Sequence, residues 1–302
     1  LIKVTATKPI TPQRLKGRRT ATGFSAGIDS YTTIKLYSNT DGEDVGPKIS
    51  DLCIFDVGAF GHGTAEEISA QYENSLSRAV TFARSSGYNA VGIKTNFNEF
   101  YSEMYNYVKT HSLRSTGAAL LMEEDIDYYL YASAYPYQDI KIAAGKAIAV
   151  MDPILLPMVS SASTTIISAG AGLSRLEKTK VVSTISGAYS YLDVCVAPAR
   201  KRMQDAFHNC SQCWKCDRTM LTLDVLGTLD KFHEAFDLKL YRRDKKKKIR
   251  MTLLCAYEGD ALDRELVEAA LSAGWKLPQK WSVILRKKVG MKVRKFKKFF
   301  VL

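Results

Sequence analysis

Three of the six cysteines in this chain fall within seven residues, at Cys210, Cys213 and Cys216, and Cys195 lies upstream with 14 residues between it and Cys210. Four thiolates close a tetrahedral site, which suits zinc and leaves no open position for catalysis. An iron–sulfur cluster is the alternative occupant. We therefore predict a structural Zn²⁺ site at these four cysteines.

A second segment has the composition of a phosphate-binding loop, and its sequence is Ser25-Ala26-Gly27-Ile28-Asp29-Ser30. Small residues let backbone N–H groups approach phosphate oxygens, and a helix that follows adds its positive N-terminal end. The hydroxyls of Ser25 and Ser30 can donate to phosphate. Asp29 beside an anion calls for Mg²⁺. The alternative is a plain strand–turn–helix connection with Ser30 as a helix cap.

These residues need elements that position them. Apolar runs predict strands at residues 21–24, 51–57, 90–94, 126–132, 164–168 and 191–196, and helical spacing predicts helices beginning at residues 31–37 and spanning residues 65–86, 113–123, 173–186 and 218–232. Strands that alternate with helices predict an α/β fold, with a parallel sheet of about five strands and helices on both faces. Ligands of such sheets lie beyond the carboxyl ends of the strands, where the loop at residues 25–30 would fall.

The loop resembles the Ser-Gly-Gly-X-Asp-Ser loop of the PP-loop ATP pyrophosphatases. The resemblance implies a HUP-type sheet, ATP and Mg²⁺ as cofactors, cleavage between the α and β phosphates, and an adenylated substrate. Ala26 takes the place of the first glycine, and a negative φ at this residue would accommodate its methyl group.

Two further features resemble the cyano-deazaguanine synthases of the queuosine pathway. Asp56, His62 and Glu66 match an Asp-Tyr-Gly segment followed by His and Glu, from which Val57 departs. The resemblance implies that Asp56 contacts the cofactor and that His62 is catalytic; a solvated loop histidine is the alternative for His62. Those enzymes also carry a similar cysteine set followed by an arginine, the place that Arg218 fills, although the upstream spacing is longer here.

A closer resemblance is to PP-loop proteins with an Asn-Cys-X2-Cys-X-Lys-Cys-X-Arg-Thr signature, which residues 209–219 fit throughout. Other stretches of the chain also resemble that group of proteins, and their residues are expected at the sheet edge that faces ATP. They are Asp152, Pro153, Ser160, Ser161, Arg175 and Lys178. Arg175 and Lys178 lie one helical turn apart and can reach one anion, so we assign them to pyrophosphate or substrate. The alternative is a solvated helix start in which Glu177 balances both cations.

The positive charge of the chain is concentrated near its end. Of its 302 residues 46% are hydrophobic and 25% charged, which is ordinary for a globular protein. Residues 1–240 carry 25 Lys+Arg and 25 Asp+Glu, whereas residues 241–302 carry 18 and 6 and hold the whole net charge of +12. We expect residues 241–302 to bind RNA or an anionic membrane surface; the alternative, for residues 286–302, is a solvated helix packed by its aromatic side on the body. Clustered cysteines and the lack of a spanning or signal segment predict a cytoplasmic protein.

Together these features predict a linker at residues 1–20, an ATP-binding domain with the zinc site at residues 21–232, and a basic extension at residues 233–302. The first functional hypothesis is a ligase that adenylates a small-molecule carboxylate, releases pyrophosphate and then transfers nitrogen. The second is an RNA-modifying enzyme of the same superfamily. The third, favoured by Ala26 and Val57, is a nucleotide-binding partner without turnover. A homo-oligomer is left open.

Overall fold

The computed structural model describes residues 19–38, 46–60, 64–100, 106–142, 147–196, 207 and 209–279. The chain divides into two compact units. The first, the sheet unit, comprises Leu1–Ser25, Thr33–Phe60 and Ser69–Gly172. The second, the helical unit, comprises Ala26–Thr32, Gly61–Ile68 and Leu173–Leu302.

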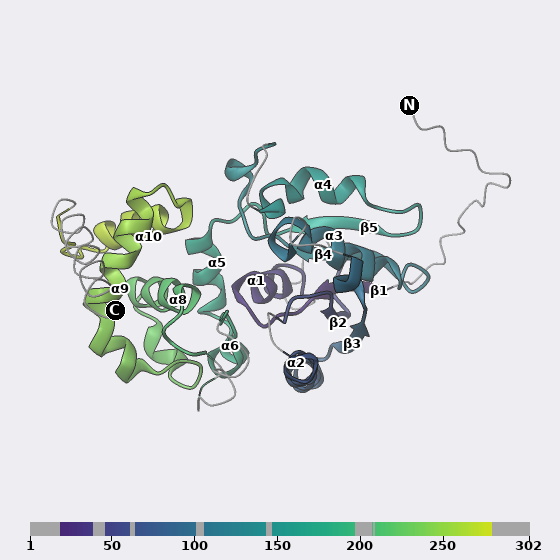
Figure 1. The fold of residues 1–302 in the computed structure, drawn as a ribbon, viewed down its shortest axis with the longest axis horizontal. Coiled ribbons are helices and arrows are strands. Elements are labelled where there is room, and N and C mark those ends of the chain that lie inside the picture. The colour runs from purple at the N-terminus through teal and green to yellow at the C-terminus, as the bar shows by residue number, and fades with distance from the viewer. Residues whose placement is uncertain are drawn as a thin grey trace, which may run out of the picture. The chain divides into compact units, whose positions relative to one another are not determined.

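The sheet unit contains five strands: β1 (Arg19–Gly23), β2 (Asp51–Asp56), β3 (Asn89–Lys94), β4 (Ile126–Ala132) and β5 (Thr165–Ala169). Their order is β3-β2-β1-β4-β5, and every neighbouring pair is parallel (Figure 1). The first five residues of β2 are all buried, as expected for a parallel strand covered on both faces, whereas β3 at the edge is largely exposed. The predicted α/β class with a five-stranded parallel sheet is confirmed.

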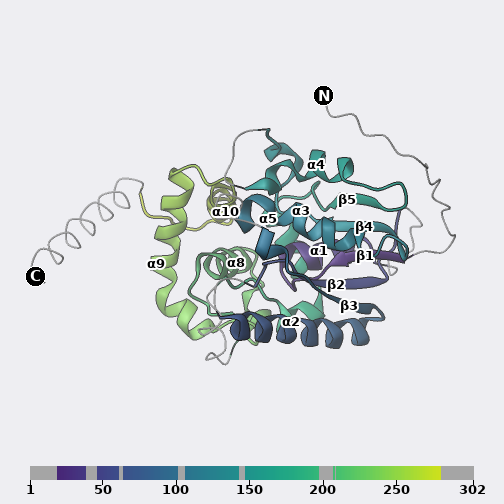
Figure 2. The same ribbon diagram turned by 45° about the vertical axis from the view of Figure 1, so that its right-hand side comes forward.

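Helices cover both faces of this sheet. On one face, α3 (Tyr107–Leu120) and α4 (Asp152–Met158) share an apolar core with β2, β4 and β5 (Figure 2). On the other face, Phe24 stacks on Phe82 of α2 (Ala65–Ser86) at 5.0 Å between ring centroids. A Cβ atom at Gly92 of β3 would lie 2.5 Å from the Tyr72 hydroxyl, so this glycine permits the close approach of α2.

The remaining helices are α1 (Ile28–Leu36), which starts in the helical unit, and five that lie wholly within it: α5 (Arg175–Val182), α6 (Ser186–Tyr191), α8 (Trp214–Val225), α9 (Leu238–Tyr257) and α10 (Ala261–Ser272). Short 3₁₀ turns occupy Phe97–Phe100, Tyr137–Asp139, Ile148–Met151 and Leu229–Phe232. Helices α8, α9 and α10 pack on one another, and α5 packs on α8 and α10. No helix in the described ranges is both long enough and apolar enough to cross a bilayer.

The helical unit departs from the sequence-based expectations in three places. The helix expected over residues 173–186 is two helices, because α5 ends at Val182 and α6 begins at Ser186. The strand expected over residues 191–196 is wrong: the Asn209 side chain, not a neighbouring strand, pairs with Leu192 O and Val194 N. Residues 238–272, expected to lie in the basic extension, form α9 and α10.

A buried carboxyl group lies where α4 begins, beside the carboxyl end of β4. Asp152 is 0% exposed, and no donor in the described part of the chain reaches hydrogen-bonding geometry with either of its carboxylate oxygens. Burial raises the pKa of Asp152 to about 7, although the nearby Ser112 hydroxyl favours the ionised form. Tyr131, whose hydroxyl lies 2.8 Å from His111 Nδ1, is the other close neighbour.

Asp152→Asn should remove a pH-dependent loss of stability. The folded-state pKa of about 7 lies above the ordinary aspartate value of 3.8, so the folded protein holds more protons between these values and is destabilised as pH rises through them. The full effect is on the order of 4 kcal/mol at pH 8, from 1.36 kcal/mol per pKa unit. Urea unfolding of both proteins at pH 5 and pH 8 should detect about 2.7 kcal/mol of it, because the carboxyl group of the unfolded chain is already largely ionised at pH 5. An equal pH dependence in the two proteins would contradict this account of Asp152.

Candidate functional site

The loop after β1 contains a strained residue. Ala26 has φ of +55°, in the left-handed region that favours glycine, so the negative φ that would accommodate its methyl group without strain is not adopted. Its carbonyl accepts a hydrogen bond from Asp193 N at 2.8 Å. The next two residues lead into α1, which begins at Ile28, so Asp29 and Ser30 lie in its first turn. Ser30 Oγ donates to Gly27 O at 3.0 Å. Strain of this kind gathers at functional sites, which supports the prediction that the loop is functional.

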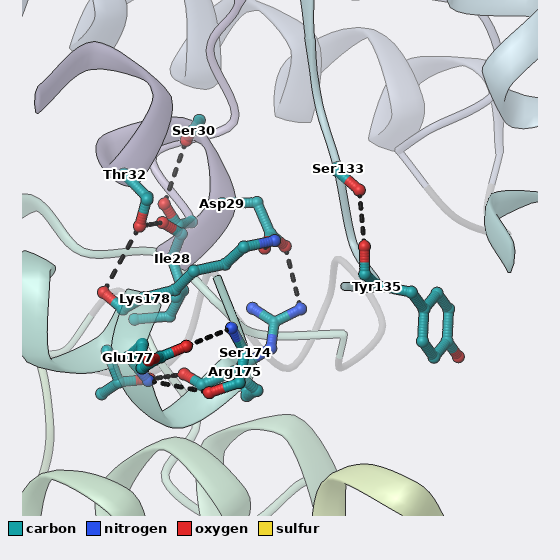
Figure 3. Close-up of polar contacts among 12 residues, drawn as sticks. Ile28, Asp29, Ser30, Thr32, Ser133, Tyr135, Ser174, Arg175, Glu177 and Lys178 are labelled. Carbon is teal, nitrogen blue, oxygen red and sulfur yellow. Dashed lines mark hydrogen bonds and ion pairs between the residues drawn. The ribbon is translucent and has the colours of Figure 1, made fainter. Parts of the chain in front are cut away.

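Asp29 forms ion pairs with two cationic side chains of α5 (Figure 3). Arg175 Nη2 donates to Asp29 Oδ2 at 3.0 Å, and Lys178 Nζ donates to Asp29 Oδ1 at 3.3 Å. The Lys178 side chain is only 1% exposed, whereas the Asp29 and Arg175 side chains are 25% and 18% exposed. The predicted pairing of Arg175 and Lys178 on one helical face is therefore confirmed, and both face the loop residue Asp29.

The electrostatics of this cluster favour charged side chains. Burial alone would raise the pKa of Asp29, but the charges of Arg175 and Lys178 outweigh it and leave that pKa lowered. Burial also lowers the pKa of Lys178, against the opposing effect of Asp29. A buried ammonium group is costly unless it is paired, so Asp29 is the counter-charge that keeps Lys178 ionised.

The start of α5 is fixed independently of these ion pairs. Ser174 caps the helix by accepting from Glu177 N, and the Glu177 carboxylate accepts from Ser174 N at 2.8 Å. Glu265 of α10 accepts from Leu176 N at 3.2 Å. Glu177 is thus a capping residue, and the interpretation in which it balances Arg175 and Lys178 is wrong.

Lys215 is a third cation of this region, and sequence reasoning noted it only as a signature letter. It lies on α8 between two of the cysteines. Its side chain reaches solvent, but the surrounding protein lowers its pKa by desolvation, and the charges of Asp29 and Arg175 both act on it. Two cations therefore contact one carboxylate, and the charge of Lys215 acts on the same cluster, which keeps a net positive charge that suits an anion with more than one charge.

The four predicted metal ligands come together in the helical unit. The Sγ atoms of Cys195, Cys210, Cys213 and Cys216 lie within 4.8 Å of one another, and those of Cys213 and Cys216 are 3.3 Å apart. Zinc–sulfur bonds of about 2.3 Å in a tetrahedron place sulfurs about 3.8 Å apart, so the arrangement fits a single ion. Hydrogen bonds from the neighbouring thiols lower the pKa of Cys213, and those from Cys195 lower the pKa of Cys210 to about 6.

Surrounding residues hold the cysteine turn in place. Ser211 has φ of +54°, and its hydroxyl accepts from Asp237 N at 2.9 Å. Lys248 of α9 is buried and donates to Ser211 O at 2.8 Å and to Asp217. Arg218, which follows the last cysteine in the signature, donates to both carboxylate oxygens of Asp263 at 2.8 and 2.9 Å. The signature arginine thus ties α8 to α10.

The other predicted site residues do not join this cluster. Asp56 lies at the carboxyl end of β2 in the sheet unit. Burial raises the pKa of its carboxyl group, although a hydrogen bond from the Gly58 backbone and the charge of Lys94 both lower it. His62 lies outside the described residues. Ser160 and Ser161 precede β5 and so lie at the amino edge of the sheet, opposite to the expected place; their hydroxyls accept from Ile166 N and Thr164 N.

No family model, curated protein or solved structure matches this chain.

Elemental analysis should find about one zinc ion per chain, held by thiolates. Removing it should destabilise the protein, because binding at a structural site contributes to the folding free energy. Cys216→Ser should lower both the zinc content and the melting temperature, since this residue is 0% exposed within the cluster. Cys255→Ser, outside the cluster, is the matched control. Metal-free protein that melts as the purified protein does would contradict a structural ion.

Ala26→Gly should stabilise the fold. It relieves about 1–2 kcal/mol of left-handed strain, while the freer unfolded chain offsets about 0.4–1 kcal/mol, so we expect a net gain of about 0.5–1 kcal/mol. Ala269→Gly, the same substitution inside α10, is the control and should cost about 1 kcal/mol. Chemical denaturation measures both. Destabilisation by Ala26→Gly would show that position 26 is not left-handed in solution.

Proposed function

We propose that this protein is an ATP-dependent adenylating ligase of the HUP/PP-loop type, which forms AMP and pyrophosphate in the cytoplasm. The observation that carries the proposal is the cluster of Asp29, Arg175 and Lys178 at the first turn of α1. Its net positive charge, the helix N-terminus and a strained turn of small residues are the features that phosphate-binding loops combine. The resemblance of residues 25–30 to the PP-loop adds to this argument.

In the proposed site the chain supplies charge and position. Arg175 and Lys178 neutralise the β and γ phosphates that leave as pyrophosphate, and Lys215 adds a third charge. Backbone N–H groups of the loop and the hydroxyl of Ser25 donate to phosphate oxygens, and the Ser30 hydroxyl would join them by turning away from Gly27 O. Such groups accelerate phosphoryl and nucleotidyl transfer mainly by orientation and by stabilising developing charge.

The reaction itself has two displacements. A carboxylate oxygen of the substrate attacks the α phosphorus of ATP, and the bond to the bridging oxygen breaks with its electron pair leaving on pyrophosphate. A nitrogen nucleophile then attacks the acyl carbon and displaces AMP. Asp29 is the residue that would hold Mg²⁺, which supplies further neutralisation of the phosphate charge when bound. The four cysteines fit Zn²⁺ in a structural role, because a closed four-thiolate site has no open coordination position.

A second candidate, an RNA-modifying enzyme, is favoured by the exposed cations of α9. Lys239, Lys246 and Lys247 are exposed on this helix. Lys248 is buried and Lys245 lies 4.1 Å from the Trp275 ring centroid, so only part of the lysine run is open to a polyanion. Nine further basic residues of this prediction, at positions 280–302, lie outside the described residues, and the membrane-surface alternative rests on the same segment.

Asp29→Asn should reduce Mg²⁺-dependent release of pyrophosphate from ATP about 100-fold or more. Asparagine keeps an oxygen for the Lys178 ammonium group but removes its counter-charge, so we expect this variant to melt earlier than the wild type, and turnover is compared below both melting temperatures. The measurement is a pyrophosphate-release screen over carboxylates and tRNA, with a thermal melt of each variant. Asp230→Asn, at an exposed ion pair with Arg242, is the control.

Full turnover by folded Asp29→Asn protein would contradict the proposal. ATP binding by the wild-type protein without pyrophosphate release on any substrate would instead favour a nucleotide-binding partner without turnover.

A further inference from the structure

A short backbone segment joins the cysteine cluster to the strained loop. Asp193 N donates to Ala26 O at 2.8 Å, and Cys195 N donates to Asp193 Oδ1 at 3.2 Å. A metal ligand and the left-handed residue of the loop are therefore linked through one intervening residue. All of these residues belong to the helical unit.

The Asn209 side chain fixes the same segment from the other side. Asn209 is 1% exposed, and its Oδ1 accepts from Val194 N at 2.9 Å while its Nδ2 donates to Leu192 O at 2.7 Å. It directly precedes Cys210, whose N–H donates to Cys195 Sγ at 3.4 Å. The two halves of the cysteine site thus hold the segment that contacts Ala26.

Ala26 needs such support, because a left-handed alanine costs about 1–2 kcal/mol and persists only where its surroundings impose it. Other contacts hold later residues: Tyr31 Oη donates to Gly187 O at 3.4 Å, and Thr32 Oγ1 to Lys178 O at 3.3 Å. They fix the first turn of α1 rather than Ala26. Asp193 is a contact placed to hold Ala26 itself, upstream of the helix, while Phe24 N donates to Cys53 O at 2.8 Å at the end of β1.

We infer that Asp193 is a positioning residue through which metal binding at the four cysteines sets the conformation of the loop at residues 25–30. With the metal bound, Cys195 and Cys210 are held together, residues 192–195 are fixed, and the Ala26 carbonyl is held in the orientation that turns the following N–H groups toward an anion. The inference rests on the proposed function only for the phosphate nature of that anion. The coupling itself is a property of the contacts between residues 26 and 193–195.

Hydrogen exchange of the zinc-loaded protein tests the coupling without any ligand. In Asp193→Ala, peptides covering residues 24–30 should exchange about tenfold faster, the effect of losing about 1.4 kcal/mol of local stability. Asp193→Asn keeps an acceptor for Cys195 N and should exchange as the wild type does. Asp244→Ala, at a half-buried position of α9 where the side chain pairs only with its neighbour Arg243 among the ion pairs described, is the control. Chelation of zinc from the wild-type protein should accelerate hydrogen exchange in the peptides covering residues 24–30 before it accelerates exchange in the peptides of β1–β5.

Unchanged exchange of residues 24–30 in Asp193→Ala, or in the chelated wild type, would overturn the inference. Equal acceleration in Asp193→Asn would overturn it too, because that variant keeps the acceptor. Binding of inorganic pyrophosphate, measured by calorimetry on the same proteins, separates this inference from the proposed function. Wild-type protein that shows the expected exchange but binds no pyrophosphate would retain the coupling and refute the phosphate site.

Discussion

The buried ammonium group of Lys178 is the constraint on which the candidate site depends. With 1% of its side chain exposed, Lys178 requires a negative partner, and Asp29 in the first turn of α1 supplies it at 3.3 Å. This pairing fixes the loop after β1 relative to α5, and Arg175 joins the same carboxylate. The lowered pKa of Asp29 shows that the attraction outweighs the cost of burial. One carboxylate facing several cations leaves a positive site at a helix N-terminus, which is the physical basis for proposing a polyanionic substrate.

Several side-chain contacts in the helical unit hold the cysteine turn or join two helices, in addition to stabilising single helices. Asn209 and Lys248 hold the cysteine turn by binding backbone groups, and Arg218 ties α8 to the start of α10. Lys215 lies between two of the cysteines, and the charges of Asp29 and Arg175 act on it. The signature that spans residues 209–219 therefore combines metal ligands with residues that bind backbone, bridge helices or add charge.

The strands and the cysteine site could be predicted from the sequence because each depends on local pattern. The apolar run of β2 and the spacing of Cys210, Cys213 and Cys216 need no knowledge of the rest of the chain. Other features depend on distant partners. Residues 191–196 look like a strand, but a side chain from Asn209 takes their hydrogen bonds. Helix α9 was missed because Lys248 occupies a buried position of its apolar face, where it binds Ser211 and Asp217. The left-handed conformation of Ala26 could not be predicted from the sequence, because glycine is the residue expected at a position with positive φ.

A crystal structure with Mg²⁺ and an ATP analogue that resists cleavage between the α and β phosphates tests the central claim most directly. The account predicts the triphosphate at the N–H groups of residues 26–30, with Arg175 and Lys178 in contact with its β and γ phosphates and the metal beside Asp29. A nucleotide bound elsewhere, with Arg175 and Lys178 still paired only with Asp29, would contradict the assignment of this cluster as a phosphate site.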